Sequence, residues 1–278
     1  MKSINCNGQL IDLSQPRVMG IINVTPDSFY TGSRAVTETK ILKQAETMLS
    51  EGATFLDIGG YSSRPGADDV SITDETQRVI PAIEAILKSF PDALISIDTF
   101  RSEVARAAID SGAALINDIS GGQLDENMLH TVAELRVPYI LMHMRGTPQT
   151  MTQHTTYDNL IEDILYYFSE RIAQARNLGI TDVIADPGFG FSKTIAQNFE
   201  LLNSLSHFRN LDVPLLVGVS RKSMIYKTLG TTAEEALNGT TALNALALNQ
   251  GAAILRVHDV APAMECVKLI EKLNVSMN

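Results

Sequence analysis

Three stretches with the same layout decide the fold: EGATFLD (residues 51–57), SGAALIN (residues 111–117) and QGAAILR (residues 250–256). In each, a glycine is followed directly by a short apolar run. Glycine adopts the left-handed conformation that closes a helix at little steric cost, so each stretch predicts a helix end and then a strand. Five positions after its glycine, each stretch carries a polar residue: Asp57, Asn117 or Arg256. The equal spacing predicts that these side chains lie at similar heights near the ends of their strands.

The same alternation of apolar runs and amphipathic segments continues along the chain. Eight runs are interpreted as buried parallel strands, because they are short, rich in β-branched residues and show little polar alternation. They are residues 18–23, 55–59, 94–98, 114–118, 139–143, 183–187, 215–220 and 254–258. Eight strand–helix repeats predict an α/β fold, a (β/α)8 TIM barrel. A doubly wound open sheet is the alternative, but no dinucleotide-binding glycine motif follows the first run.

The N-terminal segment predicts a small addition to the barrel. The pair Asn7-Gly8 stands between two short runs, which is typical of a tight β-hairpin. We expect this hairpin, over residues 3–13, to cap the bottom of a barrel formed by residues 17–275. The length of 278 residues suits one large α/β domain across residues 1–278.

Composition narrows the class of protein. The net charge of −10 argues against a nucleic-acid surface, and no run reaches the roughly 18 apolar residues of a membrane span. The N-terminus lacks the apolar core of a signal peptide. Cys6 and Cys266 are the only cysteines, which favours a reducing cytoplasm and excludes a disulfide framework. We expect a cytoplasmic protein without nucleic-acid or membrane partners, and a homodimer through the apolar residues of segment 242–248.

Polar residues gather at the predicted strand ends. In a barrel all strands end on one face, and that face holds the active site. The residues delivered there are Asn23, Asp57, Asp98, Asn117, His143, Asp186, Ser220, Arg221, Lys222, Arg256 and His258. Two long connections, residues 24–36 and 59–72, are interpreted as mobile lids over this face, because loops of that length are usually functional.

Two kinds of ligand chemistry follow from these residues. Asp98, Asn117 and Asp186 can accept hydrogen bonds from a ligand rich in N–H groups, and Lys222 can donate to a ring carbonyl or nitrogen. The apolar residues that could enclose a flat ring are Ile119, Met142 and Phe191. The second set is cationic and consists of Arg64, Arg256 and His258, and barrels often bind phosphate near their last strands. One wall is expected to bind a heterocycle and another a phosphate.

Simpler interpretations exist for several of these residues. An aspartate at a strand end is often only a helix N-cap, and this applies most to Asp57. Lys222 could be an ordinary first-turn residue, although a cation there opposes the helix dipole. His143, between two methionines, is interpreted as a structural residue and not as a metal ligand.

Eight segments, in the order of the predicted strands, resemble the dihydropteroate synthase family of bacterial folate synthesis. They are GIINVTPDSF (20–29), DIGGYSSRPGA (57–67), ISIDT (95–99), INDISG (116–121), LMHMRGTP (141–148), DPGFGF (186–191), GVSRKSM (218–224) and RVHDV (256–260). The resemblance implies condensation of 6-hydroxymethyl-7,8-dihydropterin diphosphate with 4-aminobenzoate, giving 7,8-dihydropteroate and diphosphate. It also implies that the protein is a target of sulfonamides, which mimic 4-aminobenzoate.

The resemblance also assigns roles to residues. It implies that Asn23 holds Mg²⁺ against the diphosphate, and that the pterin-binding residues are Asp98, Asn117, Asp186 and Lys222. The diphosphate-binding residues are Ser63, Arg64, Arg256 and His258. Phe191, with Pro65 and Ser223, borders the aminobenzoate pocket. Lys222, Asp98 and Arg256 are the residues expected to act in catalysis, with Lys222 as a hydrogen-bond donor.

Four positions depart from the family pattern. Tyr61 replaces a usual glutamate, Ser63 a threonine, Ser192 a glycine and Arg145 a glutamine. Two other functions are compatible with part of the motif set. A pterin-binding methyltransferase acting on methyltetrahydrofolate would need no diphosphate wall. A non-catalytic pterin-binding paralogue would have lost Asn23, Arg64 or Lys222.

Overall fold

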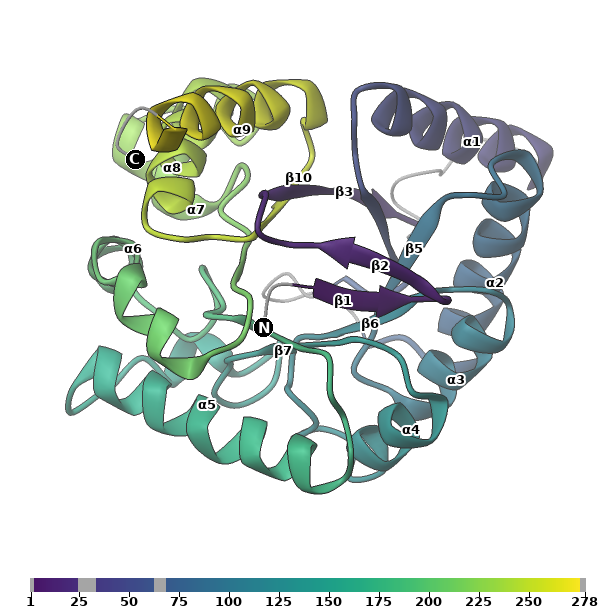
Figure 1. Cartoon of the computed structure of the whole chain (residues 1–278), viewed down its shortest axis with the longest axis horizontal. Helices are drawn as coiled ribbons and strands as arrows, with labels where there is room; N and C mark the ends of the chain where they lie inside the picture. The colour runs from purple at the N-terminus through teal and green to yellow at the C-terminus, as the bar shows by residue number, and fades with distance from the viewer. Residues whose placement is uncertain (1–2, 25–33, 63–68, 276–278) are drawn as a thin grey trace.

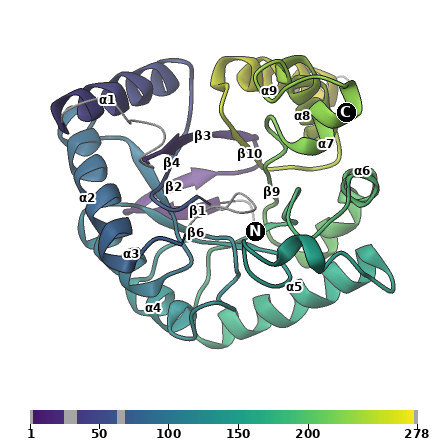
Figure 2. The ribbon, with the colours of Figure 1, turned by 180° about the vertical axis from the view of Figure 1, so that it is seen from behind.

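The computed structural model describes residues 3–24, 34–62 and 69–275. Over these residues a parallel sheet of eight strands is surrounded by helices, and a two-stranded antiparallel hairpin lies at one end (Figure 1). Figure 2 shows the opposite face of the barrel. The predicted TIM barrel with an N-terminal hairpin is therefore confirmed. Residues 25–33 of the first long connection and residues 63–68 of the second lie outside the described residues, and the latter include Ser63, Arg64 and Pro65.

The described elements follow one another along the chain as predicted. The strands are β1 (Ser3–Cys6), β2 (Gln9–Asp12), β3 (Arg17–Asn23), β4 (Phe55–Gly59), β5 (Leu94–Asp98), β6 (Leu115–Asp118), β7 (Tyr139–Met142), β8 (Val183–Asp186), β9 (Leu216–Val217) and β10 (Ile254–Val257). The α-helices are α1 (Arg34–Ser50), α2 (Ile72–Ser89), α3 (Ser102–Asp110), α4 (Met128–Leu135), α5 (Leu160–Asn177), α6 (Ile195–Asn203), α7 (Ser223–Leu229), α8 (Leu237–Asn249) and α9 (Val260–Val275). Two 3-10 helices, η2 (Met151–Gln153) and η3 (Leu205–Leu211), complete the set.

The sheet closes at its weakest strand. Its order is β8-β7-β6-β5-β4-β3-β10-β9, and a single parallel bridge between Ala185 and Leu215 joins the two ends. The predicted run 215–220 forms only a two-residue strand, because the chain leaves the sheet after Val217. It turns toward α7 at Arg221, whose φ is +54°, and the Lys222 amide donates to the Val219 carbonyl at 3.2 Å. The seventh barrel strand thus delivers its cations from a turn.

Glycines end the helices where the sequence predicts. Gly52, Gly112 and Gly251 have φ values of +102°, +103° and +106°, and Gly179, between α5 and β8, has a φ of +86°. Each therefore adopts the left-handed conformation that L side chains avoid. The three stretches with equal spacing enter β4, β6 and β10 at corresponding heights, which brings Asp57, Asn117 and Arg256 together.

The hairpin fills the bottom of the barrel. Its buried side chains pack against the first inward residues of the barrel strands in one apolar cluster: Ile4, Cys6, Ile11, Leu13, Met19, Phe55, Leu94, Leu115, Ile140, Ile184, Leu216 and Ile254. The Asn5 amide donates to Asp182 Oδ2 at 2.8 Å, and Asn7 Nδ2 donates to the Gly112 carbonyl at 3.3 Å. The bottom of the barrel is thus closed, which leaves the opposite face for a ligand.

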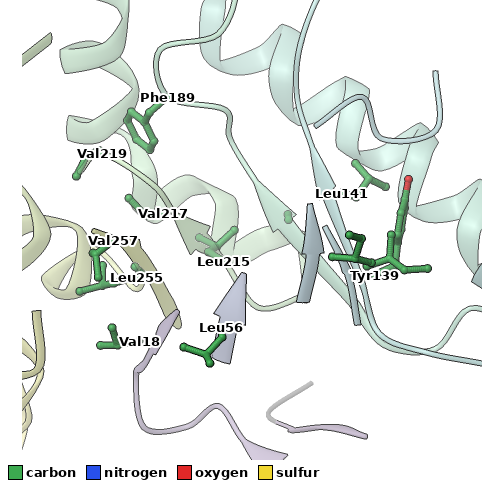
Figure 3. Close-up of a cluster of buried hydrophobic side chains, with 14 of the residues drawn as sticks. Val18, Leu56, Tyr139, Leu141, Phe189, Leu215, Val217, Val219, Leu255 and Val257 are labelled. Atoms are coloured by element: carbon green, nitrogen blue, oxygen red, sulfur yellow. The ribbon is translucent and has the colours of Figure 1, made fainter. Parts of the chain in front are cut away.

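A larger apolar core lies between the sheet and the helices. Figure 3 shows part of it, where Val18, Leu56, Leu255 and Val257 lie on neighbouring strands. Helix α1 contributes to the same core, since Ile41 and Met48 are buried in it. Burial of this much apolar surface holds the strand ends in fixed relative positions.

Candidate active site

Side chains from four strands meet at the open face of the barrel. Arg256 on β10 donates through Nε to Asp57 Oδ2 on β4 and through Nη2 to Asp98 Oδ2 on β5, both at 2.6 Å. Asn117 Nδ2 on β6 also donates to Asp57 Oδ2, at 3.0 Å. Residues separated by as many as 199 positions therefore form one hydrogen-bonded group.

Asp57 lies at the centre of this group. Its side chain is fully buried, and one oxygen accepts from both Arg256 and Asn117. The N-cap interpretation of Asp57 is wrong, because helix α2 is capped by Ser71, whose side chain accepts from the Asp74 amide. Asp57 instead fixes the direction of the Arg256 guanidinium. A sequence argument that judged each aspartate alone had no means of identifying this role.

The two other aspartates also lack a capping role. Helix α3 follows Arg101 and helix α6 follows Thr194, so neither Asp98 nor Asp186 is an N-cap. Burial raises the pKa of Asp98 to about 7, although the Arg256 guanidinium opposes that shift. Burial likewise raises the pKa of Asp186, and the nearby Lys222 ammonium opposes it. Both carboxylates therefore lie in a low-dielectric environment next to cations.

Lys222 faces the same space from the turn after β9. It occupies the N-cap position of α7 without capping it, and its Nζ donates to the Phe189 carbonyl. Burial lowers its pKa to about 8, and the Asp186 carboxylate opposes that shift. The ammonium also lies 5.0 Å from the centroid of the Phe191 ring. The predicted grouping of Asp186, Phe191 and Lys222 is therefore present.

The glycine-rich loop after β8 carries Phe191 and approaches the backbone of β7 closely. The Gly188 amide donates to Asp186 Oδ1 at 2.8 Å, and Gly188 has a φ of +72°. A Cβ added at Gly188 would lie 2.1 Å from the His143 carbonyl oxygen, so only glycine fits there. This contact sets the path of the loop toward Lys222.

Lys193 holds that loop from the inside, and sequence analysis did not identify it. Its Nζ lies 3.0 Å from His143 Nδ1, from the Gly188 carbonyl and from the Phe191 carbonyl. Burial lowers the Lys193 pKa to about 7 and the His143 pKa well below its usual value. Lys193 and Thr194 follow the glycine-rich loop as a Lys-Thr pair follows the glycines of a phosphate-binding loop. The Lys193 ammonium, however, is buried within the loop and bonds to the loop's own carbonyls. A lysine directly after a glycine-rich loop was the only available signal.

His258 extends the rim beyond Arg256. Its Nδ1 lies 3.0 Å from Ser220 Oγ, and its backbone amide donates to the same hydroxyl at 3.2 Å. The ring is exposed, whereas the neighbouring Asp259 holds Arg221 through two bonds of 2.8 and 2.9 Å. Arg221 therefore ties the turn after β9 to the end of β10. Of the two neighbouring cations, Arg221 and Lys222, it is Lys222 that faces the site.

Asn23 ends β3 beside this group and is half-buried. Its side-chain amide makes no hydrogen bond with the part of the chain that the structure describes. An amide oxygen is a hard ligand of the kind that Mg²⁺ accepts, and Mg²⁺ usually takes few protein ligands when phosphate supplies the others. No cluster of three or more His, Cys, Asp or Glu suited to a metal occurs among the described residues. Asn23 thus fits a metal held jointly with a phosphate ligand.

Apolar residues line one side of the open face. They form a separate cluster made of Ile119, Met142, Met144, Met151, Phe100, Leu124 and Phe191. The three residues that the sequence suggested for enclosing a flat ring belong to it. Flat aromatic ligands gain most from contact with such aromatic and polarizable side chains.

Two positions that depart from the family pattern, Ser192 and Arg145, contact each other. Ser192 has a φ of +46°, a conformation that favours glycine, but its Oγ accepts from the Arg145 amide at 2.9 Å. Arg145 in turn lies over the Tyr157 ring at 3.9 Å and pairs with Asp163 at 3.0 Å. The Tyr157 hydroxyl donates to the Ser192 carbonyl at 2.9 Å. Ser192 and Arg145 thus connect the loop after β7 to the loop after β8.

Tyr61 stands where the family usually has a glutamate, and its side chain makes hydrogen-bond and ring contacts in place of those of a carboxylate. Its hydroxyl accepts from Gln149 Nε2 at 2.6 Å, and its ring meets Phe100 edge-on with centroids 5.1 Å apart. The Arg101 guanidinium lies 5.4 Å from the Tyr61 ring and pairs with Glu75 at 2.9 Å. Tyr61 therefore connects the end of β4 with the loop after β7.

Comparison with known proteins agrees with this geometry. The model of the family described as "Pterin binding enzyme" matches residues 19–258. The chain therefore belongs to the pterin-binding enzyme family. Among its relatives, the dihydropteroate synthase of Escherichia coli K12 is 44% identical over 266 residues, which cover 95% of this chain and 94% of that protein. Within the family, the chain belongs to the dihydropteroate synthases, which are transferases of the folate pathway.

Solved structures lead to the same family. The dihydropteroate synthase of Yersinia pestis, solved as a sulfonamide drug complex, aligns with a TM-score of 0.92 at 41% identity, covering 98% of this chain and 99% of that chain. The enzyme of Xanthomonas albilineans with 4-aminobenzoic acid aligns with a TM-score of 0.91 at 39% identity, covering 98% of each chain. Among the described residues, no helix is a candidate for a membrane-spanning segment.

Proposed function

We propose that the rim of the barrel joins 6-hydroxymethyl-7,8-dihydropterin diphosphate to 4-aminobenzoate, releasing diphosphate. The observation that carries this assignment is the bonding of Arg256 to both Asp57 and Asp98 beside Asn117. This group offers carboxylate acceptors to a pterin and, at its edge, cations to a leaving diphosphate. A methyltransferase would have no use for the cationic edge, which favours the synthase.

The pterin is bound by Asp98, Asn117, Asp186 and Lys222 in this proposal. The ring edge of a pterin presents N–H donors that suit the buried carboxylate of Asp186, and Lys222 donates to the ring carbonyl or a ring nitrogen. As the C–O bond to the diphosphate breaks, positive charge spreads over the pterin ring. The Asp98 and Asp186 carboxylates stabilise that charge, and they do so strongly because they lie in a low-dielectric environment.

The diphosphate leaves past Arg256 and His258, with Ser63 and Arg64 of the second long loop as further ligands. Arg256 uses Nε and Nη2 to hold two carboxylates, and its Nη1 makes no hydrogen bond with described residues. That nitrogen can donate to a phosphate oxygen. Asn23 would hold Mg²⁺, which when bound neutralises charge on the leaving group.

The arylamine is neutral at pH 7 and needs no strong base. Phe191, with Pro65 and Ser223, borders its pocket in this proposal, and the Lys193 network holds Phe191 in place. Lys222 acts as a donor and not as a Schiff-base nucleophile. Borohydride trapping of a substrate adduct on Lys222 would contradict that role.

A direct assay tests the proposed function. Purified protein is mixed with pterin diphosphate, Mg²⁺ and 4-aminobenzoate, and release of diphosphate is followed together with formation of dihydropteroate. We expect release that requires all three components. Methyl transfer from methyltetrahydrofolate would support the methyltransferase, and substrate binding without any turnover would support a non-catalytic paralogue.

We also propose that the protein is a cytoplasmic homodimer. Cys6 and Cys266 are free and buried, as suits a reducing compartment. Large apolar side chains are exposed on α8 and α9, where Leu246, Leu269 and Leu273 have exposed fractions of 53%, 68% and 57%. Light scattering of the wild type and of a Leu246→Glu/Leu269→Glu variant tests this surface, because only the variant should be monomeric.

A further inference from the structure

The side chain of Tyr167, on helix α5, reaches the backbone of two neighbouring strand ends. Its hydroxyl donates at 2.9 Å to the carbonyl of Met142, the last residue of β7. It also donates at 3.3 Å to the carbonyl of Ser120, two residues beyond the end of β6. Met142 lines the apolar side of the open face, and Ser120 directly follows Ile119, which lines the same side. One hydroxyl therefore joins the two backbone segments that carry these apolar side chains.

Close packing fixes the Tyr167 hydroxyl in place. A Cβ added at Gly121 would lie 2.2 Å from the hydroxyl oxygen, so the backbone after Ser120 approaches the side chain as closely as glycine allows. The Tyr167 ring meets the His143 ring edge-on, with centroids 4.9 Å apart. Burial raises the pKa of the Tyr167 hydroxyl, and the Asp118 carboxylate adds to that shift. The hydroxyl therefore stays protonated and remains a donor.

The loop after β6 has further supports on the same side. Arg171, one helical turn after Tyr167, donates to the Gly121 carbonyl through Nε at 2.9 Å and also through Nη2. The fully buried Asp118 accepts from the Tyr139 hydroxyl at 2.6 Å. These contacts fix the path of the loop, and the Tyr167 hydroxyl joins that loop to the end of β7.

We propose that Tyr167 is a positioning residue for the pterin ring, which acts by holding Ile119 and Met142 at a fixed separation. The inference rests on the proposed function, because it takes the flat ring bound beside these residues to be a pterin. Tyr167 acts through the two carbonyls and not on a reacting atom. Without its hydroxyl, two buried carbonyls lose a donor, and the strand ends lose their shared bond. We expect the apolar side of the site to widen and its contact with the ring to weaken.

Two adjacent tyrosines on α5 give a matched test. Tyr167→Phe removes the hydroxyl and keeps the ring, whereas Tyr166→Phe removes a hydroxyl that bonds to Glu170 on the exposed side of the helix. Calorimetric titration with 6-hydroxymethylpterin, which has the ring but no diphosphate, measures ring binding alone. Tyr167→Phe should weaken this binding by about tenfold, because small displacements of positioning groups have effects on this scale. Tyr166→Phe should bind as the wild type.

A second measurement reports the position of Met142 without any ligand. In protein labelled with ¹³C at the methionine methyl groups, the Met142 signal is assigned from a Met142→Leu variant. This signal should shift in Tyr167→Phe and stay in place in Tyr166→Phe. At saturating pterin diphosphate, the KM for 4-aminobenzoate should remain near its wild-type value, because Phe191 is held by Lys193 and not by the Tyr167 hydroxyl.

Unchanged binding of 6-hydroxymethylpterin by Tyr167→Phe would overturn the inference. Equal weakening for the pterin and for 4-aminobenzoate would also overturn it, because that result indicates a general loss of structure. The titration and the methyl spectrum need no turnover. A protein that shows both expected changes but releases no diphosphate would therefore refute the proposed function alone.

Discussion

Arg256 shows how single residues in this site depend on one another. Its guanidinium bonds to a fully buried Asp57 and to Asp98, so two carboxylates share one cation. Removing one partner of a buried ion pair leaves an uncompensated charge, which is strongly destabilising. Asp57 is therefore a positioning residue for Arg256 and Asn117, while Asp98 keeps an oxygen for a ligand.

The raised and lowered pKa values of the site predict a narrow pH optimum. Activity requires ionised Asp98, whose pKa is about 7, so kcat/KM for pterin diphosphate should rise as pH passes through that value. Lys222 loses its proton above its pKa of about 8, so kcat/KM should fall there. The expected profile is bell-shaped.

A substitution separates the two sides of that profile. Arginine stays protonated throughout, so Lys222→Arg should retain the acid limb and move the alkaline limb above pH 10 or so. An alkaline limb that stays near its wild-type position in this variant would show that Lys222 does not cause it.

At the scale of elements, the loop after β8 depends on one buried lysine. Lys193→Met removes the bonds to His143 and to the carbonyls of Gly188 and Phe191. We expect the free energy of unfolding to fall by about 1–3 kcal/mol at pH 8 to 9, since buried acceptors lose their donor. The KM for 4-aminobenzoate should rise because Phe191 is no longer held.

The direction in which the free energy of unfolding changes with pH shows whether the loss in Lys193→Met comes from the buried Lys193 amine. Lys193 has a pKa of about 7 in the folded protein, against an ordinary lysine value of 10.5, so the unfolded chain binds more protons between these two values. The stability that Lys193 contributes therefore increases with pH across that window and decreases toward pH 6. Urea unfolding should show a difference between wild type and Lys193→Met that widens from pH 6 to 9. A difference that stays constant from pH 6 to 9 would contradict this account.

The connection between the end of β4 and the loop after β7 is a second property of elements. Tyr61→Phe removes the 2.6 Å bond to Gln149 and retains the ring contact with Phe100. Thermal unfolding should show a loss of about 1 kcal/mol. Tyr166 offers a matched control, because its ring is 66% exposed and its hydroxyl bonds to Glu170 within one helix. Equal losses in Tyr61→Phe and Tyr166→Phe would refute the connecting role.

The sequence predicts elements better than it predicts contacts. Glycine spacing and apolar runs predicted the eight strands, because backbone conformation and burial act locally. The shortness of β9 was not predictable, since the chain leaves the sheet at a turn in which Arg221, not a glycine, has a positive φ. From the sequence, Asp57 was interpreted as a helix N-cap and Lys193 was not identified, for another reason. Their roles arise from partners 60 and 50 positions away, at Asn117 and His143, which no local pattern reveals.

At the scale of the whole molecule, the barrel separates stability from function. The hairpin closes the bottom, and the polar group occupies the top. Ile4 is fully buried in the hairpin cluster, so Ile4→Ala should lower the free energy of unfolding by about 2–5 kcal/mol. The KM values at the rim should not change. Leu10→Ala is the control, because that side chain is 73% exposed and should cost little. Altered KM values in Ile4→Ala would contradict the separation.

The central claim is that distant strands deliver side chains which act as one catalytic unit. A double-mutant cycle on kcat/KM with Asp98→Asn, Arg256→Gln and the combined variant tests it most directly, because these residues lie 158 positions apart and bond at 2.6 Å. Groups that act together are far from additive. We expect the combined variant to lose about as much activity as the more severe single variant. Losses that multiply would show that the two residues act independently, and would contradict the account.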